Sequence, residues 1–245
     1  MFATIIALAA ATAQPQTAMT DDACARINAQ VGQKAKAEQD GIRRQLDWPN
    51  LCRYAEENAK VTSAPRIVFI GDSITEFWKR DQPTFFSSAV LDRGISGQTS
   101  EQILLRFYQD VVLLKPDAVH ILTGANDIAG NTGLITPEAW QNNIRTMVDL
   151  ARARRIKVVL GSLLPADAFW WNPSMRPAQQ LAAMNGWLRE YAKSQNVPFV
   201  DYYAAMATPT GGMKRELTDD GVHPNKRGYD VMKSVVDPTL RALAE

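Results

Sequence analysis

From residue 65 onward, short apolar runs alternate with longer amphipathic stretches. A short apolar run is typical of a strand that is buried on both faces, whereas the stretches between the runs have helical spacing. Strands that alternate with helices form a parallel sheet with helices on both faces. Five such runs predict an α/β fold: a flavodoxin-like, doubly wound, five-stranded parallel sheet of order 2-1-3-4-5. The predicted strands are 67–70, 89–92, 118–122, 157–163 and 198–200, and the predicted helices lie near 75–80, 99–113, 137–154, 176–195 and 225–243.

The first residues of the chain have a different character. Residues 1–13 are apolar or small and uncharged, and Ala11-Thr12-Ala13 has the pattern of a cleavage site. We interpret them as a signal peptide that directs export to the periplasm or the medium, although a misassigned or disordered start is the alternative. The run is too short to span a bilayer, so we expect no stable membrane insertion of the mature protein.

Residues 14–63 are predicted to form an N-terminal helical extension, and residues 64–245 the main domain. Within the extension, residues 21–60 are rich in alanine and charge and predict two helices that pack on the main domain, with a turn at Asp47-Trp48-Pro49-Asn50. Cys24 and Cys52 are the only cysteines. In an oxidising compartment one disulfide between them is expected, worth about 3 kcal/mol by loop closure. Two unpaired thiols are the alternative.

Charge narrows the classes of partner. The formal net charge is +1, and no long run of like charges occurs. This balance predicts neither a nucleic-acid groove nor a polybasic membrane-binding surface. The sequence does not specify an oligomeric state. A small-molecule or carbohydrate ester is the partner that the motifs below favour.

Polar residues follow the ends of three predicted strands. Residues 71–76 come after the first strand, residues 93–99 after the second and residues 123–127 after the third, while residues 219–225 precede the last helix. The carboxyl ends of parallel strands meet at one edge of the sheet, where open α/β folds bind their ligands. We therefore expect these four segments to line one crevice.

The first of these segments holds Ser73, and the last holds an imidazole and a carboxylate. A serine hydroxyl is a weak nucleophile at neutral pH and needs a base. His120 lies in the middle of a predicted strand and is expected to be a packed core residue, whereas His223 lies in a turn. Asp220, three residues before His223, can orient the imidazole, and the neighbouring Asp219 is the alternative.

Taken in order, the four segments resemble the conserved blocks of the SGNH (GDSL-type) hydrolase family, and residues 64–245 are thereby identified as an SGNH hydrolase domain. The resemblance implies that Ser73 is the nucleophile and His223 the base, and its D-x-x-H spacing selects Asp220. It further implies an oxyanion hole formed by the backbone N–H groups of Ser73 and Gly97 and by the side-chain amide of Asn126. The alternatives are a plain turn glycine and a capping asparagine.

The activity expected from this resemblance is metal-independent, with no cofactor: a serine ester hydrolase that forms an acyl-enzyme. The first two segments are similar to the acetylhydrolase and acetylesterase branch, which implies short acyl groups, above all acetyl, on carbohydrates or simple alcohols. A lysophospholipase- or thioesterase-like lipid hydrolase, acyl transfer to an alcohol, and a non-catalytic carbohydrate- or lipid-binding protein are the alternatives. Trp170 and Trp171 are candidates for the substrate-pocket wall, or else pack over the core.

Overall fold

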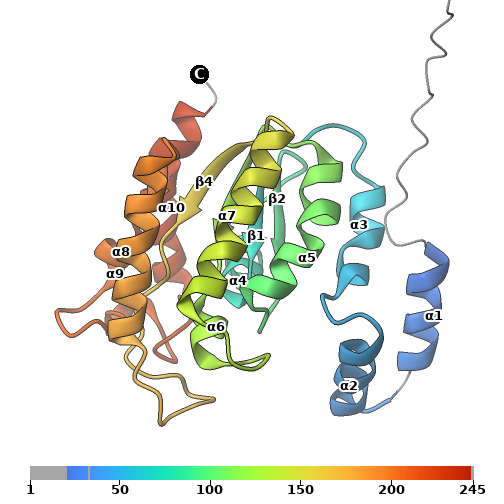
Figure 1. Cartoon of the computed structure of the whole chain (residues 1–245), viewed down its shortest axis with the longest axis horizontal. Coiled ribbons are helices and arrows are strands. Elements are labelled where there is room, and N and C mark those ends of the chain that lie inside the picture. Colours follow the sequence, from blue (N-terminus) through green and yellow to red (C-terminus); the bar gives the residue numbers. More distant parts are fainter. Residues whose placement is uncertain (1–20, 33, 244–245) are drawn as a thin grey trace, which may run out of the picture.

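A five-stranded parallel sheet forms the centre of the protein, with the strand order β2-β1-β3-β4-β5 (Figure 1). The computed structural model describes residues 21–32 and 34–243. The register places Ile67 of β1 opposite Val90 of β2 and Ala118 of β3. The predicted fold class and strand order are confirmed. The strands are β1 (Ile67–Gly71), β2 (Val90–Gly94), β3 (Ala118–Leu122), β4 (Lys157–Gly161) and β5 (Phe199–Val200).

Each face of the sheet is covered by its own hydrophobic cluster. Successive side chains of a strand point to opposite faces. In β1, Val68 and Ile70 pack on the side of α5, α7 and α8, whereas Ile67 and Phe69 pack on the side of α4, α9 and α10. All residues of β1 are buried, as the continuous apolar run indicates. These helices are α4 (Ser73–Asp81), α5 (Ser100–Asp110), α7 (Pro137–Ala153), α8 (Ala178–Ser194), α9 (Tyr202–Met206) and α10 (Lys226–Ala242).

Several element boundaries differ from the prediction. The fourth strand ends at Gly161 rather than at residue 163, because the N–H of Leu163 donates to the Asn185 side chain instead of continuing the sheet. Neither α6 (Ala125–Ala129) nor α9 was predicted, since five residues are too few to show helical periodicity. Helix α4 begins at Ser73 itself, where the Asp72 side chain caps its first turn.

The N-terminal extension is built differently from the expected pair of packed helices. Helices α1 (Asp21–Val31) and α2 (Lys36–Leu46) lie side by side, and a 3₁₀ turn η1 (Leu51–Arg53) and a short helix α3 (Ala55–Ala59) follow (Figure 1). Residues 48–58, which comprise most of the predicted turn and most of the second predicted helix, make hydrogen bonds to the main domain. The Asp47 carboxylate holds this segment by accepting the N–H groups of Leu51 and Cys52.

A disulfide joins Cys24 of α1 to Cys52 of η1, with 5.4 Å between the two Cα atoms. It ties the first helix of the extension to the segment that contacts the main domain. In the described residues, 21–32 and 34–243, no helix has both the length and the apolarity needed to cross a membrane. The predicted signal peptide at residues 1–13 lies outside the described residues.

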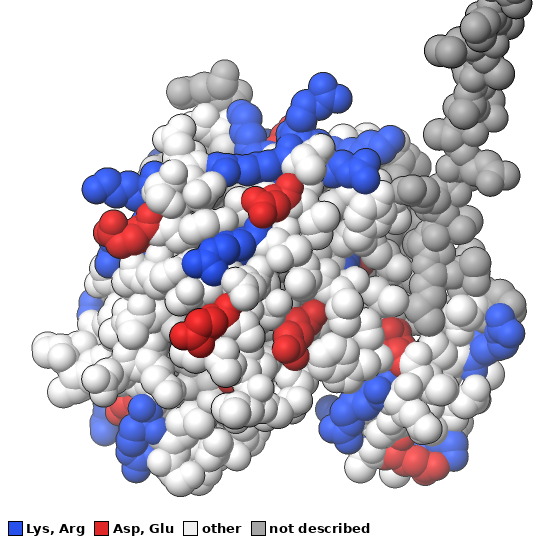
Figure 2. Space-filling model, viewed as in Figure 1, with Lys and Arg blue, Asp and Glu red and all other residues white. Residues whose placement is uncertain are grey.

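Basic side chains gather at one edge of the molecule (Figure 2). Lys115 precedes β3, while Arg154, Arg155 and Lys157 precede or begin β4, and all four are exposed. They therefore lie at the amino ends of the strands. Ser73 follows the carboxyl end of β1, so the positive charge lies at the opposite edge of the sheet from this serine.

The Asp72 carboxyl generates a prediction about stability and pH. Its Oδ1 accepts the N–H of Ile74 at 3.0 Å, but its Oδ2 has no hydrogen-bond partner among the described residues, and the side chain is buried. Burial raises the pKa of Asp72 from 3.8 to about 7. The folded protein thus keeps a proton that the unfolded chain releases, so folding becomes less favourable as the pH rises between these values.

Replacing this residue with the neutral cap Asn removes that dependence. We compare the Tm of Asp72→Asn minus the Tm of the parent protein at two pH values. We expect this difference to be about 3 °C or more higher at pH 8 than at pH 5. Thermal unfolding followed by circular dichroism measures it, with the exposed Asp149→Asn on α7 as the matched control. An equal Tm difference at the two pH values would contradict a carboxyl that is protonated in the fold.

Candidate active site

Ser73 stands where β1 turns into α4, at the carboxyl edge of the sheet. The turn is tight, because a Cβ on Gly71 would lie 2.3 Å from Thr75 Oγ1 and 2.5 Å from the carbonyl oxygen of Leu122. Glycine therefore lets the helix start directly against the strand end. Ser73 occupies the first turn of α4, where backbone N–H groups have no carbonyl partner within the helix. Its N–H can thus donate to an anion.

His223 links Ser73 to Asp220. The Ser73 Oγ lies 2.9 Å from His223 Nε2, and His223 Nδ1 lies 2.6 Å from Asp220 Oδ2. Because a carboxylate can only accept a hydrogen bond, Nδ1 carries a hydrogen and donates a hydrogen bond to Asp220. Nε2 is then the acceptor for the serine hydroxyl. The structure thus brings together the three residues that the sequence singled out, in the geometry of a base-activated nucleophile.

The turn at residues 218–224 fixes the imidazole. Asp220 Oδ1 accepts the backbone N–H groups of Val222 at 2.9 Å and His223 at 2.7 Å, while Thr218 Oγ1 donates to the carbonyl of His223. Partial burial alone would raise the pKa of Asp220, but the hydrogen bonds from the ring and backbone of His223 and from Val222 outweigh it and lower the pKa. The side chain of Asp219, the alternative partner, instead accepts from Asn225.

Asn126 and Gly97 come from the two neighbouring strand-end segments. The Asn126 Nδ2 donates to the carbonyl of Gln98 at 3.0 Å, and its Oδ1 accepts from Asn131 Nδ2 at 2.8 Å. The second N–H of the Asn126 amide makes no hydrogen bond with any described residue. Gly97 has φ +78°, a conformation that glycine adopts without strain. Asn126, in α6, thus binds the loop that contains Gly97, and its amide has a second N–H that remains available as a donor.

Asn131 is a residue that the sequence analysis missed. Its Nδ2 also donates to the carbonyl of Gly97 at 3.2 Å, and its Oδ1 accepts from Trp171 Nε1 at 3.2 Å. Asn131 therefore helps to fix the orientation of the Asn126 amide. No local pattern distinguishes it from other loop asparagines, because two of its partners, Gly97 and Trp171, lie 34 and 40 residues away along the chain.

Aromatic rings flank the imidazole of His223. The ring centroid of Phe77 lies 5.2 Å away and that of Trp171 lies 6.4 Å away. Trp171 stacks on the buried Phe169, whereas Trp170 packs edge-on against Trp171 and is 64% exposed. Of the two tryptophans singled out from the sequence, Trp171 is thus the one placed beside the imidazole.

His120 and Asp127 are further titratable residues near the site, and both are buried. His120 lies in β3 with Nε2 2.9 Å from the Tyr202 hydroxyl, and burial lowers its pKa to about 3. It is the packed core residue that the sequence predicts. Burial raises the pKa of Asp127 to about 6, although hydrogen bonds from Ser100 oppose this. Across the described part of the chain, no group of three or more His, Cys, Asp and Glu side chains could hold a metal ion.

Comparison with known proteins places this geometry in context. Residues 69–231 match the model of the GDSL-like Lipase/Acylhydrolase family. The crystal structure of a GDSL-like lipase from Bacteroides thetaiotaomicron is 41% identical with a TM-score of 0.77, and the match covers 80% of this chain and 99% of that one.

Two curated relatives are more distant. The isoamyl acetate-hydrolyzing esterase of Saccharomyces cerevisiae is 27% identical over 68% of this chain and 82% of its own length. The acetylxylan esterase of Geobacillus stearothermophilus is 24% identical over 71% of this chain and 92% of its own length. The family match covers most of the sheet, the three segments that follow strand ends and the segment of residues 219–225. The chain therefore belongs to the GDSL-like lipase/acylhydrolase family and is an ester hydrolase.

Proposed function

We propose that the protein hydrolyses short-chain esters, above all acetyl esters of carbohydrates or simple alcohols, through an acyl-enzyme on Ser73. The observation that carries this proposal is the pair of hydrogen bonds that connects Ser73 Oγ, the His223 ring and Asp220. The serine hydroxyl meets an unprotonated ring nitrogen, and the other ring nitrogen is held by a carboxylate. This is what a serine needs to act as a nucleophile.

The first half of the reaction forms the acyl-enzyme. Ser73 Oγ attacks the ester carbonyl carbon while its proton moves to His223 Nε2, and Asp220 stabilises the resulting imidazolium. When the tetrahedral intermediate collapses, the bond between the carbonyl carbon and the alcohol oxygen breaks. The leaving alcohol takes the proton from Nε2, and the acyl group stays on Ser73.

The second half releases the acid. Water gives its proton to His223 Nε2 and attacks the acyl carbon, and the collapse returns that proton to Ser73 Oγ. The His223 side chain is 17% exposed and that of Asp220 is 37% exposed, so solvent reaches this pair. Access to water favours hydrolysis over transfer of the acyl group to a second alcohol.

The negative charge on the carbonyl oxygen needs donors that are already in place. The N–H groups of Ser73 and Gly97 and the second N–H of the Asn126 amide are proposed to supply them. The orientation of that amide is set from both ends, by the Gln98 carbonyl and by Asn131. Loss of one donor of this kind typically lowers kcat by about 10² to 10³.

Three observations bear on the acyl group. Both curated esterases are named for acetyl esters, one of a simple alcohol and one of a polysaccharide. Phe77 and Trp171 both lie close to the His223 ring and would bound the space for a substrate. The name of the Bacteroides relative, a GDSL-like lipase, instead favours a lipid ester. Acyl-chain length is therefore the property to measure.

Export is also part of the proposal. The Cys24–Cys52 disulfide supports it, because disulfides persist in oxidising compartments and are rare in the cytosol. Cell fractionation with thiol labelling should find the protein outside the cytosol with both cysteines blocked. A cytosolic protein with two free thiols would contradict this proposal.

The serine mechanism predicts the outcome of a single substitution. Ser73→Ala should lower kcat for p-nitrophenyl acetate by at least about 10³-fold, because the nucleophile is lost while the fold remains. The exposed Ser234→Ala on α10 is the control and should keep parental activity. The parental rate should persist in EDTA, since no step uses a metal. Equal rates for Ser73→Ala and the parent protein would exclude Ser73 as the nucleophile.

The proposed substrate class predicts a preference for short chains. In a series of p-nitrophenyl esters from two to twelve carbons, kcat/KM should be highest for acetate or propionate and fall with each added pair of carbons. Acetylated xylan and a lysophospholipid, assayed by release of the free acid, extend the series to natural esters. A maximum at eight carbons or more would replace the acetylesterase assignment with the lipid ester hydrolase.

A further inference from the structure

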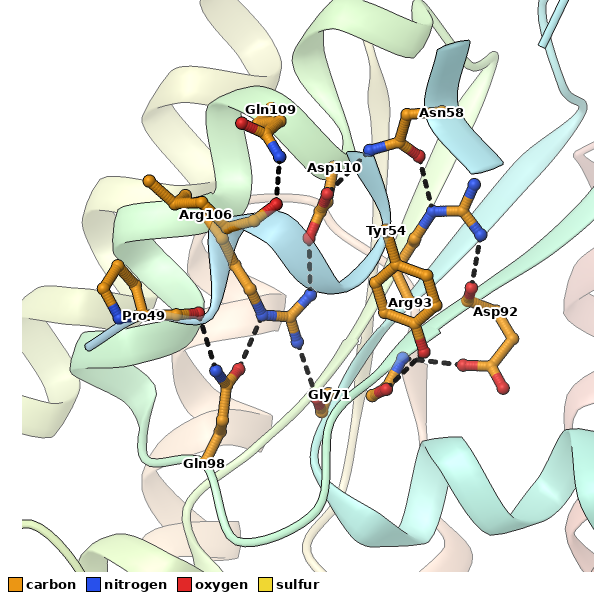
Figure 3. A network of polar contacts seen from close by, with 12 residues as sticks. Pro49, Tyr54, Asn58, Gly71, Asp92, Arg93, Gln98, Arg106, Gln109 and Asp110 are labelled. Carbon is orange, nitrogen blue, oxygen red and sulfur yellow. Dashed lines mark hydrogen bonds and ion pairs between the residues drawn. The ribbon is translucent and has the colours of Figure 1, made fainter. Parts of the chain in front are cut away.

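The N-terminal extension is bound along α5 through its main chain. Three glutamines donate their side-chain amides to its carbonyl groups: Gln98 to Pro49 at 2.8 Å, Gln102 to Trp48 at 2.8 Å, and Gln109 to Leu51. The segment between α2 and α3 has few internal partners for its carbonyl groups. Gln98, in the loop before α5, and Gln102 and Gln109 of α5 supply donors to them. Figure 1 shows η1 and α3 beside α5, and Figure 3 shows the contacts of Gln98.

Gln98 connects this segment to the candidate oxyanion hole. Its side chain is buried, with Nε2 donating to Pro49 and Oε1 accepting from Arg106 Nε at 2.6 Å (Figure 3). The carbonyl of the same residue accepts from Asn126 Nδ2 at 3.0 Å. Gln98 also directly follows Gly97. One residue thus links the extension, the Asn126 amide and the Gly97 loop.

Arg106 extends the connection to Ser73. Its side chain is fully buried, and besides Gln98 it donates to the carbonyl of Gly71 at 2.9 Å and pairs with Asp110 at 3.0 Å. Gly71 lies two residues before Ser73. The guanidinium therefore joins the end of β1 to the side chain of Gln98.

Tyr54 of the extension binds the other end of the same loop. Its hydroxyl donates to the carbonyl of Gly94 at 2.5 Å, where β2 ends and the loop begins. The Arg93 guanidinium lies over the Tyr54 ring at 4.7 Å from its centroid, and Arg93 Nε donates to Asn58 Oδ1. Asn58 Nδ2 donates in turn to Asp110 (Figure 3).

The extension therefore contacts the loop of residues 94–98 at both of its ends. A buried polar group such as the Gln98 amide destabilises the fold when it is left unpaired, so the two contacts hold the loop in one arrangement. Donors for an oxyanion act only where they are held within a fraction of an ångström of the productive position. The disulfide adds a covalent tie, because Cys52 lies between Pro49 and Tyr54.

We propose that residues 47–58 of the extension form part of the hydrolytic machinery, with Gln98 and Tyr54 as positioning residues that set the Gly97 and Asn126 donors through the loop of residues 94–98. The inference rests on the proposed oxyanion roles of Gly97 and Asn126. It assigns the extension a part in the rate of the chemical step, beyond its contribution to folding.

Steady-state kinetics with p-nitrophenyl acetate on the full chain tests this. Tyr54→Phe removes one hydroxyl and keeps the ring over Arg93, while Gln98→Leu removes the amide at similar size. Each should lower kcat about tenfold or more and change KM by less than about twofold, because the donors act on the transition state. All assays are run well below the Tm measured for each variant.

Gln109→Leu is the matched control. It removes the same kind of amide-to-carbonyl contact with the extension, at Leu51 rather than at an end of the loop. Its kcat should stay within about twofold of the parent, even if its Tm falls as much as that of Gln98→Leu. A loss of kcat in Gln109→Leu equal to that in Gln98→Leu would reduce the effect to general stability and overturn the proposal.

Asn126→Ala separates this proposal from the one on which it rests. A large loss of kcat in Asn126→Ala together with parental kcat in Tyr54→Phe and Gln98→Leu would overturn the positioning role alone. Parental kcat in Asn126→Ala would remove the oxyanion assignment itself. Should Gln98→Leu fail to fold, Tyr54→Phe decides by the same criterion.

Discussion

The hydrogen bond between Ser73 Oγ and His223 Nε2 joins residues 150 positions apart, and the rest of the site is arranged around it. The serine is placed by the end of β1 and the first turn of α4, both fixed by a buried sheet. The histidine has no such support from the sheet and depends on its own turn, where one carboxylate binds the ring and two backbone N–H groups. Asp220 thus orients the histidine, as the strand end and the first turn of α4 orient the serine.

The candidate oxyanion donors are held by polar contacts, and these are sensitive to small changes. An amide such as that of Asn126 can rotate unless both of its ends are bonded, and here Gln98 and Asn131 bind them. Gln98 and the fully buried Arg106 have partners on the main domain and, through Pro49, on the N-terminal extension. In the low dielectric of the interior, such a network is rigid when every member is paired and costly when one is not.

Local patterns were sufficient to predict the sheet and its order, because a fully buried parallel strand needs a continuous apolar run and each crossover needs a helix. They also marked the segments that carry Ser73, Asn126 and His223, which the fold brings to one edge. The sequence did not indicate Asn131, Tyr54 or the side-chain role of Gln98. Tyr54 binds Gly94 40 positions away, and the Gln98 side chain binds Pro49 49 positions away. Asn131 contacts Gly97 and Trp171, 34 and 40 positions away, so only the tertiary structure brings these groups together. The short helices α6 and α9 were missed for a different reason, because five residues are too few to show helical periodicity.

Covalent labelling tests the central claim, that Ser73 is a nucleophile activated by His223, most directly. The full chain is treated with a fluorophosphonate, which transfers its phosphonyl group to an activated serine with loss of fluoride. The product is analysed by intact mass and peptide mapping. The account predicts one adduct, on the peptide that contains Ser73, and a much slower reaction in His223→Ala at unchanged secondary structure. An adduct on another residue, or labelling of Ser73 at the parental rate in His223→Ala, would contradict it.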